Sequence, residues 1–316
     1  MMSLDTKYSR LPYVSALALA FTNFAIPVNA DNLAQTSEEA EVGYDIISDG
    51  AERIRHAGQL RTLTQQVAAA SCSLTSDIDV EEAHDILAHA TAEFDTIIVA
   101  LRVGDETLGI MGPETNRRTL HDLDEVEQEW MSIHTAIENV LADGHDVDSA
   151  HIIDDHNLRL LDLTTQLASD ITGQYAHPYE ISAADALLIE FAGRQRMLTQ
   201  KMAKDACEIW TGYHADEAVV DLKETIEIFE NSLFALRDGM PAVGIRPAPN
   251  DVILADLESL ISRWDVISEN TQTLVDGGTL NEAQKTEVFH DLEVELAELD
   301  HLLDDYKAYA ERDHDS

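Results

Sequence analysis

The chain contains an internal duplication, and no other feature of the sequence constrains its fold as strongly. Residues 57–72 and 192–207 lie 135 positions apart and are identical at 8 of 16 positions. The same offset, with a slip of one residue after Ile110, aligns further pairs: Phe94/Phe229, Gly104/Gly239, Trp130/Trp264 and Gly144/Gly278. A repeat of this length is a structural unit, so the fold is expected to contain the same unit twice.

Each copy is predicted to form four helices. Apolar residues recur at spacings of three and four, as in Leu222, Ile226 and Phe229, and strand signals are absent. The predicted helices cover residues 44–75, 80–103, 115–142 and 147–172, and then 182–212, 215–238, 250–276 and 280–311. Asp216 and Asn250 are predicted N-caps. Because short connections join antiparallel neighbours, we predict an all-α fold of two tandem up-down four-helix bundles.

The N-terminus has the pattern of a secretory signal peptide. Lys7 and Arg10 precede a mostly apolar stretch over residues 11–25, and small residues lead up to Ala30. We predict cleavage after Ala30 and a periplasmic or secreted location. An uncleaved anchor is the alternative, although the apolar run is shorter than the ~20 residues of a spanning helix.

The expected domain plan follows from these signals. Residues 1–30 are the signal peptide, 31–43 a flexible N-terminus, 44–174 the first bundle and 175–316 the second. Gly173 and Pro178 lie at the boundary between the bundles, where helix breakers are typical.

The charge of the chain excludes several partners. Asp and Glu number 61 against 20 Lys and Arg, which gives a formal net charge of −41. Such a surface repels phosphate backbones and anionic lipids, so we expect no nucleic-acid partner and no membrane insertion after signal cleavage.

No catalytic motif is recognisable, and we predict neither an enzyme nor a cofactor. The sequence has no nucleophile elbow, phosphate-binding glycine loop or zinc spacing. Glu-x-x-His, a motif of di-iron bundles, occurs as Glu81/His84, Glu287/His290 and Glu298/His301. These pairs do not follow the repeat, since position 84 corresponds to Val219, so no metal site is predicted.

The identical residues of the two copies select one face of the first helix. In the first copy this stripe comprises Gly58, Arg61, Gln65, Ala68 and Cys72, and in the second Gly193, Arg196, Gln200, Ala203 and Cys207. Spacings of three and four place such residues on one side of an α-helix. Small residues around a single cation are unusual for the surface of so acidic a protein. The stripe therefore predicts a helix–helix contact that contains an arginine.

The second copy of this helix resembles the signature of the PilJ-like domain. Residues 192–204 read Ala-Gly-Arg-Gln-Arg-Met-Leu-Thr-Gln-Lys-Met-Ala-Lys, and the first copy keeps the Gly-x-x-Arg frame at Gly58 and Arg61. PilJ-like domains are the N-terminal sensing domains of type IV pili methyl-accepting chemotaxis transducers, and they are related to the periplasmic nitrate/nitrite sensors of histidine kinases. The sequence shows no second span and no kinase or methyl-accepting region, so it is not expected to transduce a signal alone. It carries instead both halves of a dimer.

The resemblance implies a ligand site. In the nitrate-sensor branch, the arginine of the Gly-x-x-Arg frame from each subunit grips one nitrate between two first helices. That role would fall on Arg61 and Arg196, with the stripe neighbours as further ligand-binding residues: Gly58, Gly193, Gln65 and Gln200. An up-down bundle starts and ends at the same pole, so the linker allows the two copies to lie parallel as a pseudo-dimer.

In such a pseudo-dimer Cys72 would meet Cys207, and an oxidising compartment would allow a disulfide between them. Two unrelated free thiols are the alternative. Trp130 and Trp264 are expected to be core residues rather than a ligand cage.

Two functions remain open at this stage. The first is a soluble module that binds a small anion, with nitrate or nitrite as first choice, and presents its ligand state to a membrane receptor or transporter. The second is an interaction or scaffold protein, in which Arg61 and Arg196 only pair with acidic residues of neighbouring helices.

Overall fold

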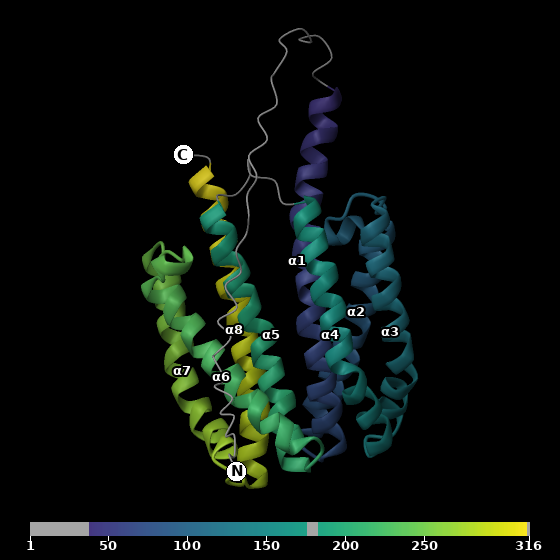
Figure 1. The fold of residues 1–316 in the computed structure, drawn as a ribbon, viewed down its shortest axis with the longest axis vertical. Helices are drawn as coiled ribbons and strands as arrows, with labels where there is room; N and C mark the ends of the chain where they lie inside the picture. Colours follow the sequence, from purple (N-terminus) through teal and green to yellow (C-terminus); the bar gives the residue numbers. More distant parts are fainter. Residues whose placement is uncertain (1–37, 176–182, 315–316) are drawn as a thin grey trace, which may run out of the picture. The chain divides into compact units, whose positions relative to one another are not determined.

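Two sets of four α-helices make up the part of the chain that the structure describes (Figure 1). This structure, a computed structural model, describes residues 38–175 and 183–314. The helices are α1 (Glu38–Thr75), α2 (Val80–Val103), α3 (Arg117–Ala142) and α4 (Val147–Tyr175), followed by α5 (Ala183–Thr211), α6 (Ala215–Asp238), α7 (Asp251–Val275) and α8 (Glu282–His314). These residues contain no strand, and the predicted all-α fold of tandem helical bundles is confirmed.

Most helix ends lie within a few residues of their predicted positions. α1 begins at Glu38, so the end of the 31–43 segment, which was predicted to be flexible, is helical. The Asn250 side chain caps α7 as expected, because it accepts hydrogen bonds from two backbone N–H groups of the first turn. The prediction for α6 is wrong: its N-cap is His214, in a left-handed conformation, and Asp216 lies inside the first turn. The predicted signal peptide lies outside the described residues.

Each bundle has its own hydrophobic core, and the two cores repeat the same aromatic pair. Phe94 stacks on Trp130 with ring centroids 3.9 Å apart, and Phe229 contacts Trp264 at 4.8 Å. Each indole N–H donates to the acidic residue that follows the phenylalanine, at 2.6 and 3.0 Å. Both tryptophans are therefore core residues whose polar atom is satisfied within the bundle.

The two bundles belong to one unit, Val42–Ser316, and are joined covalently. A disulfide links Cys72 of α1 to Cys207 of α5, with 6.2 Å between their Cα atoms, as the stripe predicts. The charges of Arg61 and Arg196, each eleven positions before its cysteine, also interact. The two helices therefore run parallel along this contact. None of the described helices combines the length and hydropathy needed to cross a membrane.

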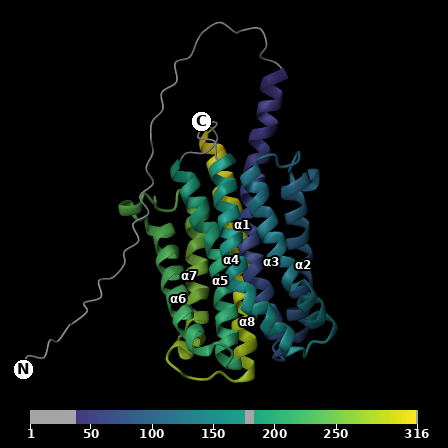
Figure 2. The ribbon, with the colours of Figure 1, turned by 45° about the vertical axis from the view of Figure 1, so that its right-hand side comes forward.

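The fourth helix of each bundle completes the interface. In Figures 1 and 2, α1, α4, α5 and α8 lie centrally, with α2 and α3 on one side and α6 and α7 on the other. Polar contacts join α4 to α5, where Lys204 pairs with Asp154 at 3.8 Å, and α1 to α8, where Gln66 donates to Glu293 at 2.9 Å. We call these the α4–α5 edge and the α1–α8 edge.

The two edges correspond by the repeat. Three buried pairs align α4 with α8 at a constant offset of 136 residues: Ile153/Phe289, Leu160/Leu296 and Leu167/Leu303. At the α1–α8 edge, each bundle contributes a side chain to the core of the other: Phe289 packs in the first core and Ala69 in the second. Equivalent positions of the two edges can therefore be compared to see which residues the packing requires.

Candidate functional site

The two stripe arginines lie at the contact between α1 and α5, but their surroundings differ. Arg61 is half-buried, and its Nε donates a long hydrogen bond of 3.5 Å to the Gly58 carbonyl. No described carboxylate lies within ion-pair distance of Arg61. Burial lowers the pKa of Arg61; Glu190 raises it, and the charges of Arg194 and Arg196 lower it further. Arg61 thus lies in the field of one acidic and two basic side chains, and no described carboxylate forms an ion pair with it.

Arg196 is buried and has such a partner. Its Nε lies 2.5 Å from Oδ1 of Asp300 on α8. Burial raises the pKa of Asp300, and the charge of Arg196 partly offsets that rise. Arg196 also lines a cavity of about 250 Å³ at the α1–α8 edge, whose walls are Arg55, Gln59, Arg196, Asp300, Leu303, Asp304 and Lys307. Three cations and two acids thus line this cavity, an excess of positive charge on a chain that is strongly acidic.

The difference between the arginines follows from one position of the repeat. At the 136-residue offset, Asp300 corresponds to Thr164 of α4. The Thr164 hydroxyl donates to the Leu160 carbonyl of its own helix at 2.9 Å, so it offers Arg61 no charge. Arg196 therefore pairs with an acid of a neighbouring helix, as a purely structural role would require. Arg61 does not.

The other predicted ligand residues lie close by with different partners. Gln65 is buried and donates to Asn157 of α4 at 2.9 Å. Gln200 is equally buried and lies against Glu293 of α8, the equivalent of Asn157. Burial raises the pKa of Glu293 to about 7, and the neighbouring amide groups of Gln66 and Gln200 oppose the rise. Both stripe glutamines therefore contact the fourth helix of their own bundle.

The stripe glycines do not mark a close approach of backbones. A Cβ built on Gly58 would lie 3.5 Å from Nη2 of Arg61, and one built on Gly193 would lie 3.9 Å from the Leu303 methyl carbons. Both are ordinary van der Waals distances. The Gly-x-x-Arg frame thus leaves space around the arginine rather than bringing two helices together.

A buried charge cluster at the α4–α5 edge was missed by the sequence analysis. It comprises Lys204, Asp205 and Glu208 of α5 with Asp154 of α4. The equivalents of the α5 residues in the first copy are Ala69, Ala70 and Ser73, so a search for identities between the copies passed over them. The i,i+4 spacing of Lys204 and Glu208 was the available signal, but such pairs are common on solvated helices.

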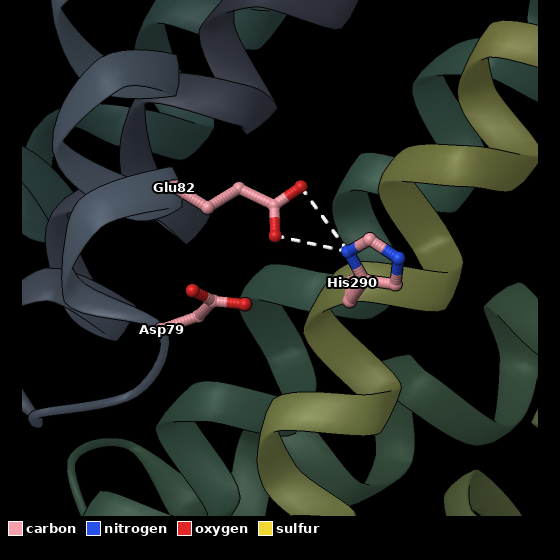
Figure 3. Close-up of side chains that lie close together, drawn as sticks. All are labelled: Asp79, Glu82 and His290. Atoms are coloured by element: carbon pink, nitrogen blue, oxygen red, sulfur yellow. Dashed lines mark hydrogen bonds and ion pairs between the residues drawn. The ribbon is translucent and has the colours of Figure 1, made fainter.

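Two groups of side chains have the composition of a divalent-cation site. The first joins Asp79 and Glu82 of the first bundle to His290 of α8 (Figure 3), and its ligand atoms lie within 4.8 Å of one another. His290 Nδ1 is 2.9 Å from Glu82, whose hydrogen bond raises the pKa of His290. The second group is Asp256, His301 and Asp305. His290 and His301 each belong to a Glu-x-x-His motif. In both groups the acids come from elsewhere in the chain, and the motif residues Glu287 and Glu298 do not take part.

One family model matches the chain twice, at residues 47–155 and 180–289; it describes the N-terminal region of type IV pili methyl-accepting chemotaxis transducers. The chain belongs to the PilJ family. The two matches together span most of the chain, so this PilJ protein is a tandem array of sensor-type modules. No curated protein matches it significantly.

Proposed function

We propose that this tandem PilJ protein binds a small oxyanion, with nitrate or nitrite as first choice, between α1 and α5. The observation that carries the proposal is the half-buried Arg61 guanidinium, which forms no ion pair with a described carboxylate, although Glu190 acts on it at longer range, and which lies in the field of Arg196. Two neighbouring guanidinium groups repel each other, and an anion between them removes that repulsion. Their planar N–H forks suit flat oxyanions, which can accept two hydrogen bonds from each fork.

In this proposal, Asp300 lowers the affinity of the site for an anion. Its carboxylate occupies one side of Arg196, so an incoming anion must share Arg196 with it. Arg55 and Lys307 line the adjoining cavity and raise the local potential. A focused positive potential of this kind favours anions even on a chain with a net charge of −41.

Arg61→Gln is expected to weaken nitrate binding roughly tenfold to a hundredfold, because a charged hydrogen-bond donor is lost. Isothermal titration calorimetry with nitrate, nitrite and acetate at low ionic strength measures the effect. Arg102→Gln is the matched control, because Arg102 pairs with Asp124 and Glu127 away from the stripe. No saturable heat from the wild-type protein with any of these anions would favour the scaffold function.

Nitrate affinity is also expected to rise as the pH falls. Nitrate stays charged, whereas Asp300, whose pKa burial raises, becomes protonated and releases Arg196. Asp300→Asn should therefore bind nitrate more tightly than wild type at neutral pH and lose most of the pH dependence. Glu217→Gln removes an exposed acid of α6, away from this cavity, and serves as the control. An unchanged pH profile in Asp300→Asn would contradict this role.

We further propose that the module works in the periplasm or outside the cell and presents its ligand state to a membrane receptor or transporter. The family's sensor role and the Cys72–Cys207 disulfide, which needs an oxidising compartment, support this location. The scaffold function keeps one specific observation in its favour, the Arg196–Asp300 ion pair. In a scaffold, Arg61→Gln would alter stability without any change in anion binding.

A further inference from the structure

A second cavity lies at the α4–α5 edge, beside the disulfide. Its volume is about 400 Å³, which is within the range of small-molecule sites. Small and apolar side chains form much of the wall, including Ala68, Val147 and Ala150. Two carboxyl groups, Asp154 and Glu208, also line it.

Part of the remaining wall is aromatic. Tyr213 and His151 both line the cavity, and their rings stack with centroids 3.6 Å apart and planes at 6°. The Tyr213 hydroxyl donates to Asp155 at 2.8 Å, which holds the ring in place from outside the cavity. An aromatic wall near acidic groups is the combination that recognises organic cations.

The charges behind the cavity do not balance. Lys204 Nζ lies 2.5 Å from Glu208, 3.1 Å from Asp205 and 3.8 Å from Asp154. Lys201 lies 2.8 Å from Asp205 and is the other ammonium group of the cluster. Lys201 also lies 3.3 Å from the more exposed Asp221, so two ammonium groups face four carboxyl groups, three of which are shielded from solvent. Without a ligand, a proton on one of the shielded carboxyl groups reduces this excess of negative charge.

Glu208 holds that proton. Burial raises the pKa of Glu208 to about 9, its hydrogen bond with Asp154 raises it as well, and Lys204 opposes the rise. At neutral pH the Glu208 carboxyl is therefore protonated and shares its proton with Asp154. A cation in the cavity could take the place of this proton.

The α1–α8 edge indicates that the fold does not require these charges. There the equivalents of Lys204, Asp205 and Glu208 are Ala69, Ala70 and Ser73, all buried, and the bundles pack through Ala69. The equivalent of Asp154 is His290. Buried charged groups usually cost stability relative to apolar side chains of similar volume. Since the same interface forms without them, the α4–α5 cluster needs a reason other than packing.

We propose that the cavity at the α4–α5 edge binds a small organic ammonium ion, with its cationic head between Asp154 and Glu208 and against the Tyr213 ring. Binding releases the proton shared by the two carboxyl groups to solvent, so the net charge of the cluster stays the same. The short apolar wall accommodates a small alkyl group. The proposal concerns other residues and the opposite ligand charge from the oxyanion site at Arg61.

Calorimetric titration of the oxidised full chain with ethylammonium chloride and tetramethylammonium chloride tests the proposal. Both titrations are run in two buffers of different ionisation enthalpy, with sodium chloride at equal ionic strength as the reference. A saturable heat is expected from at least one ammonium salt, with release of about one proton per ligand bound at neutral pH. No saturable heat from either ammonium salt, or an equal heat from sodium chloride, would overturn the proposal.

Glu208→Gln resembles the protonated glutamate in shape and should leave the fold intact. It is expected to weaken ammonium binding roughly tenfold or more and to abolish proton release. Glu217→Gln makes the same chemical change on the exposed face of α6 and should match wild type. Tyr213→Leu removes the aromatic wall and should weaken binding while proton release continues. Unchanged affinity and proton release in Glu208→Gln would place the cation elsewhere and refute the assignment.

The two proposed sites can fail separately. Arg61→Gln should leave ammonium binding unchanged, and Glu208→Gln should leave the response to nitrate unchanged. If Glu208→Gln lost both responses while its circular dichroism spectrum stayed native, the cavity would not be an independent cation site, and the proposal would be rejected.

Discussion

The Cys72→Ser/Cys207→Ser double variant is expected to lose about 3–5 kcal/mol of unfolding free energy. The disulfide joins residues 135 positions apart, so it closes a large loop in the unfolded chain and removes much of its conformational entropy. It also links two bundles that otherwise meet through non-covalent contacts, such as those of Phe289 and Ala69. Loss of the bond should therefore destabilise the interface as well as the unit as a whole.

Urea denaturation followed by circular dichroism measures this loss. Wild type under reducing conditions should approach the double variant, and the double variant itself should not respond to reductant. A difference of less than about 1 kcal/mol would mean that the interface is held by packing, through contacts such as those of Phe289 and Ala69.

Arg53→Met is expected to cost about 3–5 kcal/mol, because it leaves buried acids without their cation. Arg53 is only 2% exposed. Its Nε donates to the Asp49 carboxylate at 2.8 Å, and its Nη1 lies 3.8 Å from Glu114. Its guanidinium also donates to the backbone carbonyls of Leu101 and Gly112. One side chain therefore ties α1 to the connection between α2 and α3.

The repeat offers a comparison for this residue. The equivalent of Arg53 in the second copy is Leu188, also buried, and the equivalents of Asp49 and Glu114 are Ala184 and Ala248, so the fold accepts an apolar residue there when these two acids are replaced. Arg55→Met is the control, since Arg55 is half-buried and pairs locally with Glu52. Thermal and urea unfolding of the two variants should differ by several kcal/mol. Similar losses in both would show that the acids around Arg53 become neutral at little cost.

Much of the architecture was accessible from the sequence because it depends on periodicity and repetition. The apolar spacing predicted the eight helices, and the repeat paired Cys72 with Cys207 through equivalent positions on parallel helices. Helix starts were less accessible. His214 takes the N-cap of α6 in a left-handed conformation that follows from the preceding turn, while Asp216 has the residue type usually found at caps.

The candidate site was only partly accessible. The stripe identified Arg61 and Arg196 because both copies share them. The partner of Arg196 is Asp300, about a hundred residues away on another helix, and no local spacing relates the two. The same holds for the Asp154–Glu208 cluster, whose members come from different bundles.

The sequence by itself determined the helical class, the duplication, the acidic surface and the face on which the arginines lie, because these depend on residue type and local spacing. Only the tertiary structure decided which charges meet: Arg196 pairs with Asp300 and Glu208 lies against Asp154, whereas Arg61 forms no ion pair with a described acid. The reason is that electrostatic partners are set by the packing of distant helices, and a single difference such as Thr164 for Asp300 changes them without changing the fold.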